Sequence, residues 1–301
     1  MKQRIAAFIF AVLASITGLV SDYTETTAIE EERMAEAAEY TEIGALRNVR
    51  FGGYTIDEMI SSFEDVGTAP EKSLFSGKRL IEVPLINQYP LLPCGCEIAS
   101  TVSLLNLLGY NTTLQSFTDG FINHTTNVGN DYGFTRIKAQ NSNEEDTLIG
   151  PDPKEVFIGN PYGWGYGCKA PVISTAINEY FTTAQSDFKA LDVYDLKAPD
   201  FKRLINGGIP VIVWATLDME SFDYRDPSVW TVEETGETIT WYKGSHTLLM
   251  CGYDADAYYF MDPNDKETII PYPQKLFLTR FEEAGSQAVL VIKEEKEKAA
   301  E

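Results

Sequence analysis

Apolar residues recur at helical spacing in the segment after Gly95, at Ile98, Val102, Leu105 and Leu108. This spacing predicts a buried amphipathic helix, and Gly109 is a suitable residue to end it. An extended run, Val83 to Asn87, and a turn bracketed by two prolines come before the helix. The pattern therefore changes from strand-like to helical close to Cys96.

The rest of the chain shows helical patterns first and strand patterns second. Helices are predicted at Glu30–Tyr40, Tyr54–Phe63, Thr113–Phe121, Val172–Phe181 and Phe201–Asn206, the last capped by Asp200. Strands are predicted at Val211–Leu217, Glu237–Tyr242, Ser245–Tyr253, Ala257–Met261, Phe277–Phe281 and Gln287–Ile292. Residues 123–154 are polar and predict a long loop, and residues 218–235 are interpreted as a second insertion. This order favours an α+β fold with an antiparallel sheet.

Four segments differ in composition. Residues 1–21 combine basic positions with an uncharged run, Ile5 to Val20, which is short for a membrane span and typical of a signal peptide. We therefore expect a secreted protein, with an uncleaved N-terminal anchor as the alternative. Residues 22–78 form an acidic extension or linker, residues 79–293 one compact domain, and residues 294–301 a charged tail.

The charge of the chain restricts its partners. The 301 residues include 24 basic and 45 acidic side chains, which gives a formal net charge of −21. Nucleic acids and anionic membrane surfaces attract basic patches, so neither is an expected partner.

The four cysteines are too sparse for a disulfide scaffold. A bridge between Cys94 and Cys168 is one possibility, because both lie in glycine-rich turns, and the absence of any disulfide is the other. Cys251 lies in an apolar strand and is interpreted as a core residue.

Cys96 lies at or next to the first turn of the predicted helix. Free backbone N–H groups and the positive end of the helix dipole favour a thiolate there, and the thiolate is the nucleophilic form. The alternative is a small buried core residue. Cys94 precedes Gly95, outside the helix, and gains less from the helix terminus.

The chain has only two histidines. His124 lies in a polar loop and is interpreted as a solvated residue. His246 begins a predicted strand whose hairpin turn is centred near Asp254, and this register places His246 opposite Asp262 or within two positions of it. A carboxylate beside an imidazole orients the ring and stabilises its charged form. Asn264 is a rival for this role, and Asp262 could instead cap the turn.

Gln88 lies just upstream of the candidate nucleophile. Its amide N–H, with the backbone N–H of Cys96, could stabilise an oxyanion, whereas the alternative is an exposed turn residue. The order Cys96, His246, Asp262, with the first two 150 positions apart, is typical of papain-like peptidases.

Four stretches resemble the bacteriocin-processing, double-glycine leader peptidase-like family (peptidase C-thirty-nine-like): VPLINQYPLLPCGCEIAS, DPKEVFIGNPYGWGYGCKAPVISTAIN, LINGGIPVIVWA and SHTLLMCGYDADAYYFMDP. The resemblance implies a papain-like fold, with an N-terminal helical part that carries the cysteine and a C-terminal antiparallel sheet that carries the histidine and aspartate. It implies catalytic roles for Cys96, His246, Asp262 and Gln88. The papain signature itself is absent, since CGCE stands in its place.

The residues together predict a secreted thiol hydrolase that cleaves peptides or proteins. A non-catalytic peptide- or cell-wall-binding module on the same fold is the alternative, and acyl transfer by the same three residues is a third possibility. No cofactor or metal is expected, because two histidines without C-x-x-C spacing do not make a usual zinc site.

Overall fold

The computed structural model describes residues 49–72, 77–125, 133–139, 146–264 and 268–294. The chain divides into two compact units, Met1–Val49 and Arg50–Glu301, and nearly all described residues belong to the second. The predicted signal peptide and the predicted helix at Glu30–Tyr40 lie outside the described residues. No helix among the described residues is long and apolar enough to cross a lipid bilayer.

An eight-stranded sheet forms the centre of the second unit, and all of its pairings are antiparallel. Its strands are β1 (Glu71–Lys72), β2 (Arg79–Leu80), β7 (Phe188–Tyr194), β8 (Val211–Thr216), β11 (Ser245–Tyr253), β12 (Ala257–Met261), β13 (Ile270–Pro273) and β14 (Gln287–Lys293). They run in the order β1-β2-β11-β8-β14-β7, with β12 on β11 and β13 on β12. Strands β8 and β11 are buried on both faces, apart from a partly exposed first residue in β11, which explains their continuous apolar sequences.

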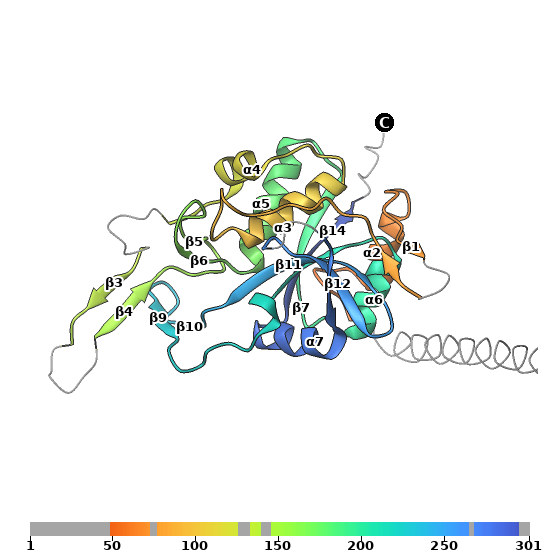
Figure 1. Ribbon diagram of the computed structural model, residues 1–301. Coiled ribbons are helices and arrows are strands. Elements are labelled where there is room, and N and C mark those ends of the chain that lie inside the picture. Colours follow the sequence, from red (N-terminus) through yellow and green to blue (C-terminus); the bar gives the residue numbers. More distant parts are fainter. Residues whose placement is uncertain (1–48, 73–76, 126–132, 140–145, 265–267, 295–301) are drawn as a thin grey trace, which may run out of the picture. The chain divides into compact units, whose positions relative to one another are not determined.

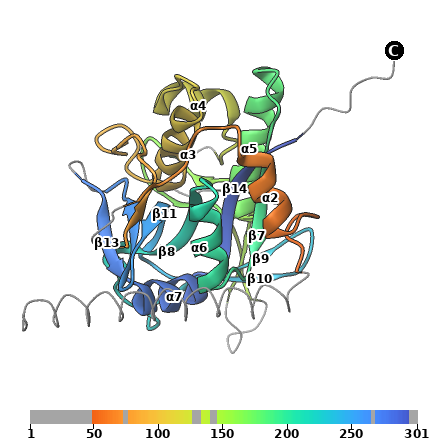
Figure 2. The same cartoon turned by 90° about the vertical axis from the view of Figure 1, so that its right-hand side faces the viewer.

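Six α-helices occur among the described residues: α2 (Ile56–Phe63), α3 (Cys96–Leu107), α4 (Leu114–Phe121), α5 (Ala170–Thr183), α6 (Ala198–Asn206) and α7 (Gln274–Glu283). Helices α3, α4 and α5 lie on one side of the main sheet, and α6 and α7 lie on the other (Figures 1 and 2). The fold is therefore α+β, with helices packed on both faces of an antiparallel sheet.

Two smaller sheets lie beside the main one. One has the order β10 (Thr238–Trp241), β9 (Ser228–Val232), β4 (Thr147–Gly150), β3 (Thr135–Ile137), and the other pairs β5 (Ile158–Gly159) with β6 (Gly165–Gly167). The rings of Trp230 and Trp241 stack with their centroids 6.4 Å apart. Together with Ile158, Val232 and Ile239 they form a small hydrophobic core that is separate from the main one. The prediction of a loop at residues 123–154 was therefore wrong in part, because β3 and β4 from this segment pair with each other and β4 pairs with β9 from the insertion at residues 218–235.

Two local predictions need correction. Phe277 and Phe281 lie in helix α7 rather than in a strand, and both are buried because residues four apart share one helix face. Asp200 is not the N-cap of α6: it is the third residue of that helix, and its carboxylate accepts a hydrogen bond from the backbone N–H of Lys197.

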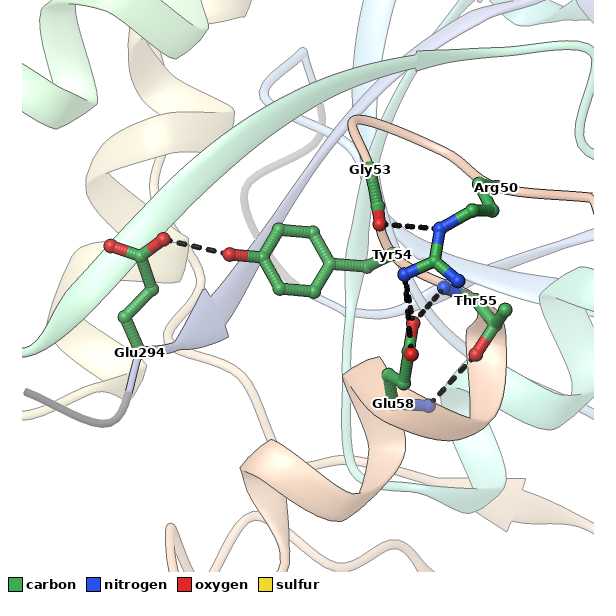
Figure 3. A network of polar contacts seen from close by, with 6 residues as sticks. All are labelled: Arg50, Gly53, Tyr54, Thr55, Glu58 and Glu294. Carbon is green, nitrogen blue, oxygen red and sulfur yellow. Dashed lines mark hydrogen bonds and ion pairs between the residues drawn. The ribbon is translucent and has the colours of Figure 1, made fainter. Parts of the chain in front are cut away.

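The second unit begins at Arg50, well before the boundary near residue 79 that the sequence predicted. The side chains that anchor this added segment in the main core are Phe51, Ile56, Met59 and Phe63. Its polar groups are also fixed (Figure 3): Thr55 and Glu58 form a capping box at the start of α2, and Arg50 pairs with Glu58. The hydroxyl of Tyr54 donates to Glu294, directly after β14, at 2.7 Å.

Candidate active site

Helix α3 begins at Cys96, which leaves that residue partly exposed, while every side chain from Glu97 to Leu105 is buried. Buried serines in this helix therefore need hydrogen-bond acceptors from neighbouring segments. The hydroxyl of Ser100 donates to the backbone carbonyl of Thr247 on β11 at 3.2 Å. This bond fixes the N-terminal half of α3 against the start of β11, next to His246.

His246 and Asp262 form a buried pair. His246 Nε2 lies 2.7 Å from Asp262 Oδ1, and the two residues are only 4% and 3% exposed. The backbone N–H of Asn264 donates to the same carboxylate oxygen at 2.9 Å. Burial raises the pKa of Asp262, but the hydrogen bond and charge of His246 and the Asn264 N–H outweigh it and hold that pKa below its ordinary value.

A β-bulge sets which side of the sheet Asp262 faces. β11 and β12 shift register between Met250 and Gly252, so the pairing of Leu249 with Met261, continued by one residue, places Asp262 opposite Leu248. Alternate residues share a face, so Asp262 and His246 lie on the same side. Without the extra residue Asp262 would face the other side.

Directly after the bulge, the backbones of β11 and β2 approach each other closely. Gly252 pairs with Leu80 of β2, and a Cβ at Gly252 would lie 2.5 Å from the carbonyl oxygen of Arg79. Only glycine therefore fits at this position without displacement of β2.

Gln88 is 5% exposed and tightly held. Its backbone N–H donates to Pro263 at 3.0 Å, directly after Asp262, and its Nε2 donates to the carbonyl of Pro93 at 2.9 Å. Its Oε1 is buried without a hydrogen-bond partner among the described residues. An amide donor is thus fixed in orientation beside the turn that leads to Cys96.

Cys96, His246 and Gln88 line one cleft of about 470 Å³. Exposed apolar side chains also line it: Tyr89, Trp164 and Leu217. Asp262 contacts the His246 ring but is not part of the lining, whereas Asn264 is. The structure therefore brings the four candidate residues to one place from segments far apart in the sequence.

The pKa of the Cys96 thiol is shifted in the opposite direction from the one expected at a helix N-terminus. Burial and the carboxylate of Glu97, whose Oε2 accepts a hydrogen bond from the Cys96 sulfur at 3.3 Å, raise the pKa of the Cys96 thiol well above its ordinary value. The helix terminus was expected to favour the thiolate, but burial of the thiol, which is the largest cause, and the neighbouring Glu97 carboxylate outweigh the partial backbone charges. Sequence reasoning missed Glu97, and its only signal was an acidic residue directly after the cysteine.

All four cysteines are free in the structure, so there is no disulfide bridge between Cys94 and Cys168. Cys94 also lines the cleft and donates to the carbonyl of Gly165 at 3.7 Å, and burial raises its pKa. Cys251 is buried in β11. His124 lies outside the cleft and forms a β-bridge with Phe157.

Residues 80–289 match the Peptidase_C39 like family, and this segment is more than half of the chain. The chain therefore belongs to this family, and membership indicates a cysteine peptidase. No curated protein matches the sequence.

One solved structure similar to this chain is a crystal structure of a candidate C39-like peptidase from Bacillus anthracis. The two share 21% sequence identity with a TM-score of 0.59, and the match covers 73% of this chain and 99% of the other. At this identity the likeness shows a common fold.

Proposed function

We propose that this protein is a secreted cysteine peptidase with a papain-like fold, in which Cys96, His246 and Asp262 form the catalytic triad. The observation that carries the proposal is the buried pair of His246 Nε2 and Asp262 Oδ1, 2.7 Å apart, beside a cleft that Cys96 and His246 both line. A buried imidazole that is oriented by a carboxylate and faces a thiol is what covalent catalysis requires.

The hydrogen bond between His246 and Asp262 determines which nitrogen of the imidazole ring is available for the proposed reaction. Asp262 engages Nε2, so Nδ1 is the nitrogen that takes the proton from the Cys96 thiol. The thiolate attacks the peptide carbonyl, and His246 returns the proton to the departing amine, which leaves a thioester on Cys96. Water, deprotonated by His246, then hydrolyses the thioester and restores the thiol.

Gln88 and the backbone N–H of Cys96 are the proposed oxyanion donors. The bond from Gln88 Nε2 to Pro93 uses one of the two amide hydrogens, and the second can serve the tetrahedral intermediate. The Pro93 contact fixes the amide before substrate arrives, so little reorganisation is needed when charge develops.

Peptides or proteins are the proposed substrates, outside the cell. Export rests on the basic start and uncharged run of residues 1–20. The net charge of −21 favours cationic over anionic macromolecular partners. The exposed side chains of Tyr89, Trp164 and Leu217 beside the cleft offer apolar surface for a substrate side chain.

A peptide library analysed by mass spectrometry tests this function. We expect the protein to produce new peptide termini by addition of water, and an epoxide-type thiol inhibitor to stop the reaction irreversibly because it alkylates the nucleophile. Peptides that are bound but never cleaved would indicate a binding module instead. Products that carry an added amine rather than water would indicate acyl transfer.

A further inference from the structure

Glu97 occupies an unusual place for an acidic residue in the first turn of a helix. Such residues are usually exposed, where the helix dipole and water both stabilise their charge. Glu97 is only 4% exposed and follows the candidate nucleophile directly. Its two carboxylate oxygens have different partners: Oε2 accepts from the Cys96 sulfur at 3.3 Å, and Oε1 accepts from the backbone N–H of Cys168 at 3.0 Å.

The surroundings of Glu97 fit its carboxylate closely. Gly167 lies against it, and a Cβ at that position would be 2.4 Å from Oε1. Within the part of the chain that the structure describes, no lysine or arginine nitrogen lies within the 4.0 Å ion-pair distance of Glu97. The amine of Lys169 instead lies over the ring of Trp241, 4.6 Å from its centroid.

Several titratable groups face this carboxylate. They are Cys96 on the same helix, His246 on β11, and Cys168 and Lys169 on the segment that leads into α5. Burial is the largest influence and raises the pKa of Glu97 above its ordinary value, against the hydrogen bonds from Cys168 and Cys96 and the charge of His246. A buried carboxyl without an ion-pair partner gains and loses its proton closer to neutral pH.

We propose that Glu97 is a positioning residue whose proton decides whether the Cys96 sulfur is held as a thiol or used as a thiolate. This inference rests on the proposed function, since it takes Cys96 as the nucleophile. An ionised Glu97 accepts the S–H bond and opposes a second negative charge 3.3 Å away. A protonated Glu97 becomes the donor to the sulfur and stabilises the thiolate.

The protons balance in this exchange. Glu97 takes a proton from solvent, and the proton that leaves Cys96 passes to Nδ1 of His246, which gives a thiolate and an imidazolium side by side. Peptidase activity should therefore fall as the pH rises through the pKa of Glu97. In Glu97→Gln the amide donates to the sulfur at every pH, so the reactivity of Cys96 should lose this dependence.

The test is the rate at which iodoacetamide alkylates Cys96 in the full chain, followed by peptide mapping between about pH 4 and pH 9. We expect Glu97→Gln to react about tenfold faster than the wild type at the alkaline end of this range, as for a thiol pKa lowered by one unit, and the two rates to converge towards its acidic end. Glu179→Gln, an exposed change on α5, should follow the wild type. Identical profiles for the wild type and Glu97→Gln would overturn the proposal.

Two features keep this test decisive. If Glu97→Gln does not fold, the profile of His246→Ala decides, because that variant lacks the imidazole that exchanges a proton with Cys96. Coupled titration of Glu97 and Cys96 then still gives two inflections, and a single inflection contradicts the proposal. Alkylation also requires no substrate. A chain that cleaves no peptide but shows the expected profile would refute the peptidase function and leave the Glu97–Cys96 coupling standing.

Discussion

Replacement of Cys96 by alanine is expected to abolish peptide hydrolysis, with kcat lower by roughly 10⁴-fold or more, because it removes the proposed nucleophile. The fold should survive, since the side chain is partly exposed at the first position of α3 and alanine is the best helix former. The measurement is kcat on a peptide that the wild type cleaves, together with a circular dichroism spectrum to verify folding.

Cys94→Ala is the matched control, because Cys94 lines the same cleft two residues away but precedes the helix. We expect it to keep turnover within about tenfold of the wild type and to keep labelling of Cys96 by thiol alkylators. Loss of activity and labelling in Cys94→Ala, with both retained in Cys96→Ala, would show that the nucleophile was assigned to the wrong thiol.

Replacement of His246 by alanine is expected to lower kcat by roughly 10³-fold or more, because it removes the group that accepts and returns the proton. It also leaves the carboxylate of Asp262 buried without its main partner, so the variant should unfold at a lower temperature as well. Both effects follow from one buried pair, and they are measured by steady-state kinetics and by thermal unfolding.

The other histidine of the chain provides the control. His124 lies outside the cleft, so His124→Ala should change kcat by no more than about twofold. Equal turnover by His246→Ala and the wild type would rule out the proposed mechanism, whatever the effect on stability.

The sequence predicted the central strands well, for a simple physical reason. β11 and β12 have the predicted bounds, Ser245–Tyr253 and Ala257–Met261, because each is an apolar run that ends at a turn of polar residues. The start of α3 at Cys96 followed from the change of period after Gly95. These features depend on local sequence, and local sequence is what periodicity reports.

The elements that were missed depend on contacts between distant segments. β4 pairs with β9, and the paired residues are about eighty positions apart in the sequence. Neither segment has a long apolar run of its own, so the pattern of residues did not reveal either strand. The spacing of Phe277 and Phe281 fits a helix, but five residues are too few to separate a helix from a strand by pattern alone.

The candidate site shows the same division. The hairpin sequence indicated that Asp262 would come close to His246, but the face on which it lies depends on a bulge that the sequence did not reveal. The influence of Glu97 on Cys96 was also hidden, because it arises from burial beneath Gly167 and Cys168, which lie some seventy residues further along. Register and burial are properties of the folded chain.

The most direct test of the central claim is the separation of the Cys96 sulfur from Nδ1 of His246 in a crystal structure of the protein. We expect about 3–4 Å, the range in which a proton can pass between the two groups in an enzyme without substrate. A separation beyond about 8 Å, or a Cys96 sulfur bound in a disulfide, would contradict a catalytic triad at this site.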